Sequence, residues 1–126
     1  ILQAGSFRWL SPGVIKAYRA PFPDNKLKVG AKAFPAMVPH EPDQDGVAQM
    51  QKARNVLEKW EKPVQVLFGK QDFILGKARH YFLNKIPGAK KVKQIAMAKA
   101  GHFLQEDQPA QLNNQIGAFL EGKLDI

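Results

Sequence analysis

The spacing of hydrophobic residues changes about halfway along the chain. Over residues 47–60 they recur at helical spacing, which predicts a helix with one apolar face. Pro63–Phe68 is instead a short run of β-type residues, and a second such run covers Val92–Met97. Helices are predicted after each strand, over residues 76–84 and 109–122.

The first part of the chain follows local signals and is interrupted by proline. Ser11 suits an N-cap and Pro12 a first helical position, so a short helix is expected to about Tyr18. Asp24 is expected to cap the next helix, which Pro35 must kink or restart because proline lacks an N–H donor. Its apolar positions are Leu27, Ala31, Phe34 and Val38. A polar loop follows over residues 39–46.

The order strand, helix, strand, helix predicts an α/β fold with a parallel pair of strands joined by a right-handed crossover. Loops that follow parallel strands meet at one edge of the sheet, where open α/β sheets bind their ligands. Two strands cannot bury both faces of such a sheet, so the chain is expected to be the end of something larger.

Two residues in these loops point to acid–base chemistry. His102 follows Gly101 after the second strand, and Asp72 lies just past the first strand. A carboxylate bonded to one ring nitrogen of a histidine fixes the tautomer and leaves the other nitrogen as a base. We therefore predict His102 as a general base and Asp72 as its acid. The alternative for Asp72 is an ordinary turn or cap residue, and Glu106 and Asp107 fit better as acids at a helix N-terminus.

A nucleophile is missing from this set. Ser6 and Ser11 are the only serines, and neither lies in a Gly-x-Ser-x-Gly turn between strand and helix. The absence of cysteine excludes thiol catalysis and disulfides and fits a cytoplasmic location. No histidines and carboxylates have metal-ligand spacing, so no metal is expected. The chain is therefore predicted not to hold a complete catalytic triad.

Composition limits the classes of protein to which the chain could belong. Hydrophobic residues make up 44% and charged residues 24%, which is typical of a globular protein and not a disordered one. The net charge of +8 suits nucleic-acid binding, but the lysines around the Pro87–Gly88 turn have no stacking aromatic residues among them. We expect no nucleic-acid partner. The apolar runs are also too short to span a membrane.

At these residues the chain resembles the haloalkane dehalogenases of the α/β-hydrolase superfamily. Ala100–Glu106 (Ala-Gly-His-Phe-Leu-Gln-Glu) looks like the segment around that family's catalytic base. Gln71–Gly76 resembles the loop that carries the acid in members that place it after the seventh strand. Ala20–Asp24 and Lys32–Val38 look like the last part of the family's helical cap. The similarity runs from about Ser11 to Leu120.

The resemblance implies a fold class and a mechanism. The fold would be the C-terminal portion of an α/β-hydrolase, with the rear of a helical cap over residues 1–46 and the βαβα part of the main domain over residues 47–126. An aspartate nucleophile outside this chain would displace halide and form an alkyl-enzyme ester. His102 would activate water to hydrolyse the ester, and Asp72 would orient His102. The implied partners are a halogenated hydrocarbon, halide, water and the missing N-terminal part of the fold.

The resemblance also implies a substrate pocket and no cofactor. The positions that match pocket walls in similar enzymes are Phe34, Pro35, Val38, Ile74 and Leu75. Plain core packing is the alternative for these five. Trp9 and Trp60 do not stand in the sequence contexts of the family's halide-binding residues. Two other interpretations of the whole chain remain open: another α/β hydrolase such as an epoxide hydrolase, and a non-catalytic fragment or binding module.

Overall fold

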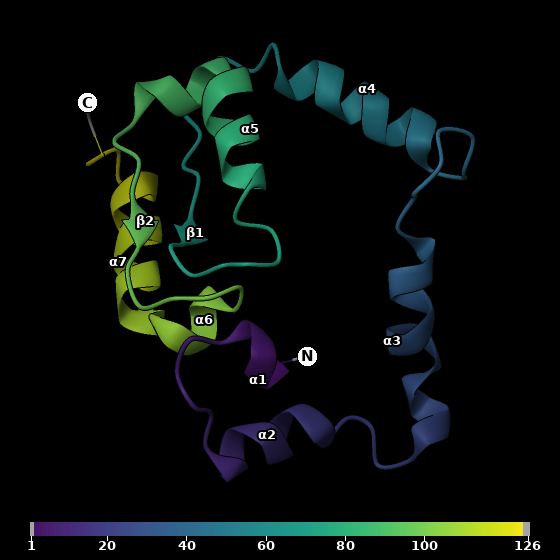
Figure 1. Ribbon diagram of the computed structural model, residues 1–126. Coiled ribbons are helices and arrows are strands. Elements are labelled where there is room, and N and C mark those ends of the chain that lie inside the picture. The colour runs from purple at the N-terminus through teal and green to yellow at the C-terminus, as the bar shows by residue number, and fades with distance from the viewer. Residues whose placement is uncertain (1, 125–126) are drawn as a thin grey trace. The chain divides into compact units, whose positions relative to one another are not determined.

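The computed structural model describes residues 2–124 and divides the chain into two compact units (Figure 1). The strand unit combines Ile1–Leu10 with Val56–Ile126, and the helical unit is Ser11–Asn55. This division follows contacts within the chain. The assignment of residues 1–46 to a cap and 47–126 to a main domain stays a prediction.

The helices of the helical unit begin where local capping signals occur. Helix α2 (Pro12–Arg19) starts after Ser11, whose Oγ accepts the N–H of Val14 at 3.3 Å. The next turn, η1 (Asn25–Lys28), starts after Asp24, whose Oδ1 accepts the N–H of Lys26 at 2.9 Å. Both predicted caps are confirmed, because each side-chain oxygen satisfies an N–H that has no partner inside its own helix.

Proline breaks the remainder of this unit, as expected. Helix α3 (Val29–Ala33) gives way to the 3₁₀ turn η2 (Phe34–Met37), with Pro35 in its first turn. A loop over residues 39–46 then leads to α4 (Val47–Leu57), which ends earlier than the predicted Trp60. The prediction that Pro35 kinks or restarts the helix is confirmed, with a restart as a 3₁₀ turn.

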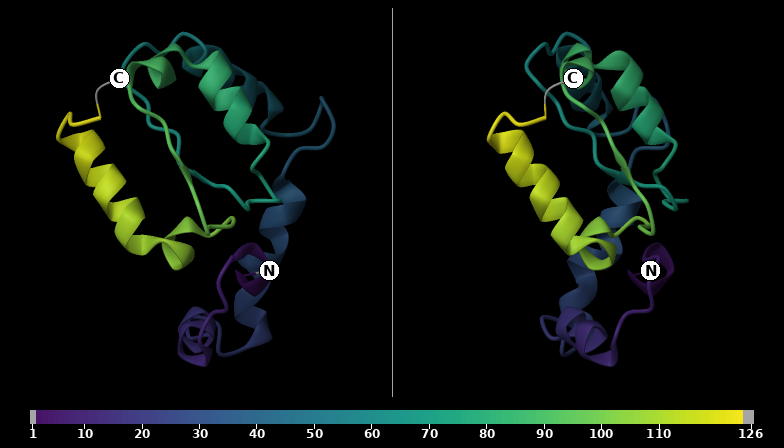
Figure 2. Two further views of the ribbon diagram at one scale, coloured as in Figure 1. Left: turned by 60° about the vertical axis from the view of Figure 1, so that its left-hand side comes forward. Right: turned by 90° about the vertical axis from the view of Figure 1, so that its left-hand side faces the viewer.

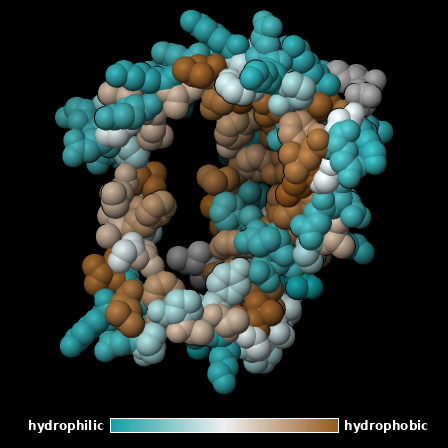
Figure 3. Space-filling model, turned by 180° about the vertical axis from the view of Figure 1, so that it is seen from behind, coloured by the Kyte–Doolittle hydropathy of each residue, from teal (hydrophilic) through white to brown (hydrophobic). Residues whose placement is uncertain are grey.

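Hydrophobic side chains of the helical unit are largely uncovered. Residues 11–55 are all described, and none of them is buried. Val29, Phe34 and Met37 are 67%, 72% and 71% exposed. Tan and brown side chains cover much of the segment around α3, at the left of Figure 3. This unit has helices but no core of its own.

The strand unit follows the predicted alternation of strands and helices. After the short helix α1 (Leu2–Gly5), strand β1 (Phe68–Gly69) pairs in parallel with β2 (Ala96–Met97), with Phe68 opposite Ala96. The two views of Figure 2 show α5 and α7 on opposite sides of the strands. The remaining elements are α5 (Ala78–Lys85), η3 (Pro87–Lys91), α6 (Leu104–Asp107) and α7 (Pro109–Leu120).

Both strands are much shorter than predicted, and Gln94 explains part of the difference. Its Oε1 accepts the N–H of Val66 at 2.8 Å, while its Nε2 donates to the carbonyls of Val64 and Ala89 at 2.7 Å each. A side chain therefore occupies backbone groups that a longer strand ladder would use. The segment before β1 is held beside its neighbour without regular pairing.

The core of this unit includes a residue of the segment that precedes β1. Val66, Ile86 and Ala89 are buried together, and Phe82 packs against them. Met97 and Ala100, at the end of β2 and just beyond it, are fully buried. The strand ends that carry the predicted site are therefore among the least exposed parts of the chain.

Candidate functional site

The loops that follow β1 and β2 lie side by side and are tied through the backbone. The N–H of Lys70 donates to the carbonyl of Met97 at 2.8 Å, and the N–H of Gln71 donates to that of Ala100 at 3.0 Å. The Gln71 side chain returns the contact, accepting the N–H of Ala100 at 3.1 Å. These bonds continue the parallel pairing beyond the strands and bring the two predicted residues to one edge.

His102 and Asp72 meet at this edge. His102 Nδ1 lies 3.2 Å from Asp72 Oδ2, within hydrogen-bond distance. The Asp72 side chain is 5% exposed and that of His102 is 28% exposed. A carboxylate at Nδ1 favours a proton on that nitrogen and leaves Nε2 for proton transfer. The ring therefore remains accessible while its acid is shielded from solvent.

Asp72 is itself held in place and kept ionised. Its Oδ1 accepts the N–H groups of Ile74 and Leu75, each at 2.9 Å. Burial acts to raise the pKa of Asp72, but the N–H of Leu75, the His102 ring and the N–H of Ile74 outweigh it. The pKa of Asp72 is therefore below its usual value, and the carboxylate is charged at neutral pH. The turn hydrogen bonds expected of an ordinary aspartate are present together with the bond to His102.

The loop of His102 is also held by the first residues of the chain. The carbonyl of Gly5 accepts the N–H of His102 at 2.7 Å and that of Phe103 at 3.2 Å. Asp107 Oδ2 accepts the N–H of Gly101 at 2.7 Å and that of Phe7 at 2.8 Å. The other oxygen of Asp107 accepts the N–H of Arg8 at 2.9 Å.

These contacts change the interpretation of Asp107. It does lie just before α7, as expected, but its oxygens bind backbone N–H groups of the loop and of residues 7–8 rather than serving mainly as a helix-terminal charge. No local sequence pattern signals this role, because Asp107 and its partner Phe7 are 100 residues apart.

Glycine at position 101 is needed for this close approach. A Cβ at Gly101 would lie 2.5 Å from the carbonyl oxygen of Gly5, closer than such atoms can come. At Gly5, a Cβ would meet the ring of Phe103 at 2.6 Å, so a side chain there would require that ring to shift.

The five predicted pocket residues are exposed and lie in different units. Ile74 and Leu75, in the strand unit, are 44% and 53% exposed, and their N–H groups bind Asp72. Phe34, Pro35 and Val38 belong to the helical unit and are also exposed. The alternative of plain core packing does not describe any of them within this chain.

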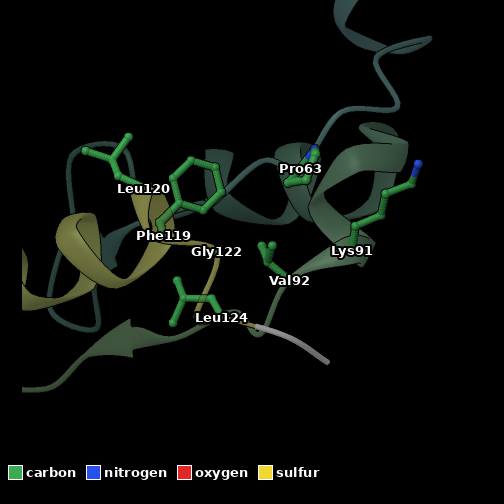
Figure 4. A pocket seen from close by; sticks show the side chains of 7 residues that line it. All are labelled: Pro63, Lys91, Val92, Phe119, Leu120, Gly122 and Leu124. Carbon is green, nitrogen blue, oxygen red and sulfur yellow. The ribbon is translucent and has the colours of Figure 1, made fainter.

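A separate hollow of about 330 Å³ lies away from His102 and Asp72. Figure 4 shows Phe119 and Leu120 of α7 on one side of it and Pro63 and Lys91 on the other. Its lining is mostly apolar and includes no histidine or carboxylate.

Residues 2–124 contain no cluster of histidine and acidic side chains that could hold a metal ion. Within the same range, no helix has the length and apolar character needed to cross a bilayer.

The curated proteins that the chain resembles are haloalkane dehalogenases. No family model matches the chain. It is 40% identical over 116 residues to a haloalkane dehalogenase of Mycobacterium marinum, covering 92% of this chain and 39% of that protein. A haloalkane dehalogenase of Psychrobacter cryohalolentis is 37% identical over 119 residues, covering 94% and 39%. The chain thus spans about two fifths of the length of the curated relatives it matches.

A solved structure shows the fold. A mutant haloalkane dehalogenase, DatA from Agrobacterium tumefaciens, superimposes with a TM-score of 0.79 at 24% identity, covering 95% of this chain and 41% of that one. The predicted fold class, the C-terminal portion of an α/β-hydrolase fold, is confirmed, as is the resemblance to haloalkane dehalogenases.

Proposed function

We propose that this chain supplies the general base His102 and its orienting acid Asp72 to a longer hydrolase that cleaves carbon–halogen bonds. The observation that carries the proposal is the 3.2 Å contact between His102 Nδ1 and Asp72 Oδ2, at the carboxyl ends of two parallel strands. Similarity to curated proteins named haloalkane dehalogenase supports the choice of reaction.

The reaction would run in two steps. An aspartate carboxylate outside these residues attacks the carbon that bears the halogen, so that a C–O bond forms and halide leaves with the bonding electrons. His102 Nε2 then removes a proton from water, which attacks the acyl carbon of the ester. The bond between acyl carbon and alkyl oxygen then breaks, and His102 returns its proton to that oxygen, which releases the alcohol. The carboxylic acid that remains loses a proton and restores the carboxylate. The sum is haloalkane plus water giving alcohol, halide and a proton.

Asp72 has two roles in this scheme. It keeps the His102 proton on Nδ1, so that Nε2 faces the water as a base. It also stabilises the imidazolium that forms when Nε2 takes the proton, because its own charge is retained at neutral pH. No cofactor is required for either step.

In the strand unit, Ile74 and Leu75 are proposed to line the substrate pocket. For Phe34, Pro35 and Val38 of the helical unit, a role in that pocket is proposed from the sequence resemblance alone. These side chains are apolar and exposed, which suits a weakly polar haloalkane. Ile74 and Leu75 follow directly from the turn that holds Asp72, so substrate bound against them would lie near the base. The nucleophile and the halide-binding groups are proposed to lie outside this chain.

The test is halide release by the product of the whole reading frame that contains this chain, here called the full-length protein. We expect catalytic release of bromide and chloride from 1-haloalkanes, and much slower hydrolysis of epoxides. The 126-residue chain alone is the matched control and is expected to release no halide. A folded full-length protein that hydrolyses epoxides but not haloalkanes would contradict the proposal. If the reading frame encodes only these residues and its product releases halide, the proposal that the nucleophile lies outside this chain is contradicted.

A further inference from the structure

Three consecutive N–H groups of the His102 loop are bound by two acceptors. Gly101 donates to Asp107 Oδ2, and His102 and Phe103 both donate to the carbonyl of Gly5. The same Asp107 carboxylate accepts from Phe7 and Arg8, so it joins the loop to the segment that carries Gly5. The backbone on which the histidine stands is thus held from both sides.

The strength of this arrangement comes from burial and charge. Asp107 is 7% exposed, and bonds from N–H groups to an ionised carboxylate are roughly twice as strong as those between neutral groups. Removing one acceptor would leave buried N–H groups without a partner, which is costly. The loop therefore has little freedom to move while Asp107 is intact.

The contact between His102 and Asp72 leaves little tolerance for such movement. Its length of 3.2 Å is at the long end of the hydrogen-bond range. Asp72 is fixed separately by the N–H groups of Ile74 and Leu75 and would not follow a displaced histidine. A shift of a few tenths of an ångström at Gly101 would therefore weaken the hydrogen bond that sets the histidine tautomer.

We propose that Asp107 is a positioning residue for His102, acting through Gly101 and the segment Gly5–Arg8 and touching no reacting atom. The inference rests on the proposed function, since it assigns Asp107 to the step in which His102 is the base. Halide displacement needs the nucleophile and not His102, so Asp107 should matter for the second step only.

The principal variant is Asp107→Asn in the full-length protein. Asparagine has one acceptor oxygen and an NH₂ group, so it cannot accept from Gly101, Phe7 and Arg8 together. Asp43→Asn is the matched control, because it is the same substitution at an aspartate in an exposed loop of the helical unit. Rapid-quench kinetics separate the halide burst from ester hydrolysis.

For Asp107→Asn we expect a burst of about one halide per active site and ester hydrolysis slowed about ten- to a hundredfold, as for misplaced catalytic groups. Both kcat and KM should fall while kcat/KM stays near the parent value, because kcat/KM reports the halide-displacing step. A loss of fold would lower kcat/KM as well. Hydrolysis at the rate of the Asp43→Asn control would overturn the proposal.

Nitrogen NMR of labelled histidine provides a readout that needs no turnover. The His102 Nδ1 signal should move in Asp107→Asn and stay unchanged in Asp43→Asn. If the folded parent protein releases no halide at all, the proposed function fails, while this spectrum still tests the positioning. An unchanged His102 signal in folded Asp107→Asn would overturn the positioning role.

Asp107→Glu is the second variant in case the asparagine protein does not fold. It keeps the charge and both acceptor oxygens but is one methylene longer, so it should fold and displace Gly101. Slower ester hydrolysis with an intact burst supports the proposal. Parent rates for both steps in Asp107→Glu would contradict it.

Discussion

The two units of the molecule form their structure in different ways. In the helical unit, caps and prolines act within a few residues of the elements they control, as Ser11 and Asp24 do, and no residue of 11–55 is buried. In the strand unit, the site is held by bonds between distant segments, from Gln71 to Ala100 and from Phe7 to Asp107.

This difference shows that forming helices and positioning catalytic side chains depend on different interactions. Local signals can set helices without a core, but they cannot hold two side chains from loops 30 residues apart at 3.2 Å. That requires backbone fixed on both sides by buried groups, which only the strand unit has. Substitutions in the strand unit should therefore have larger effects than chemically identical ones in the helical unit.

The largest effect is expected from Asp72→Asn in the full-length protein. Asparagine can keep much of the turn but loses the charge that stabilises the imidazolium. Loss of such an orienting carboxylate costs up to about 10⁴ in rate in a serine protease. Steady-state halide release should fall by orders of magnitude. Asp24→Asn is the matched control, since Asp24 also accepts the N–H of the residue two positions further along the chain. The activity of the Asp24→Asn protein should be unchanged. Equal losses of halide release in the two variants would contradict the claim that the strand unit holds the site and the helical unit does not.

Substituting one glycine in each unit tests the same comparison through the free energy of unfolding. Gly101→Ala should lower the free energy of unfolding by about 1–3 kcal/mol, because the new Cβ meets backbone atoms of Gly5 and Phe7 that cannot move aside easily. Gly30→Ala, in α3, meets nothing within 4 Å and should raise it by up to about 1 kcal/mol through helix propensity. Urea unfolding of both variants gives the two values. Destabilisation by Gly30→Ala equal to that by Gly101→Ala would contradict the account.

Asp72 should also make stability depend on pH. Its pKa is lower in the folded protein than in the unfolded chain, so its contribution is complete above the unfolded value of about 3.8 and is lost as pH falls through the lower folded value. The stability difference between parent and Asp72→Asn should therefore be constant near neutral pH and shrink in strong acid. Urea midpoints of both proteins at a series of pH values measure it. A difference that grows on acidification would have the wrong sign.

The smallest effect is expected from Ser11→Ala. It removes the N-cap of α2, whose bond to Val14 is long at 3.3 Å, and should cost about 0.5–1 kcal/mol. Activity should not change, because Ser11 acts only on its own helix. Circular dichroism with urea unfolding provides the stability, and halide assay provides the rate. A change in catalytic rate would show that the helical unit influences the site more than its local bonding indicates.

Much of the site was predictable because its signals are local. A β-type run, a glycine and then a polar residue marks a loop at a strand end, and parallel pairing brings two such loops together. This predicted that His102 and Asp72 would meet. The turn around Asp72 follows from the ability of aspartate to accept N–H groups two and three residues on.

The missing parts depend on contacts that sequence spacing does not encode. Strand lengths were overestimated because the side chain of Gln94 bonds to backbone groups of Val64 and Val66. The contact of Gly5 with the His102 loop joins residues about a hundred positions apart. Neither β propensity nor local capping rules can anticipate such bonds.

The most direct test of the central claim, that His102 is the base for the second step, is a rapid-quench measurement on His102→Ala in the full-length protein. The variant should release about one halide per active site and then stop, with the alkyl ester retained on the protein and detected by mass spectrometry. Displacement needs only the nucleophile, whereas hydrolysis needs the base. Continued halide release over many turnovers, with no trapped ester, would contradict the assignment of His102.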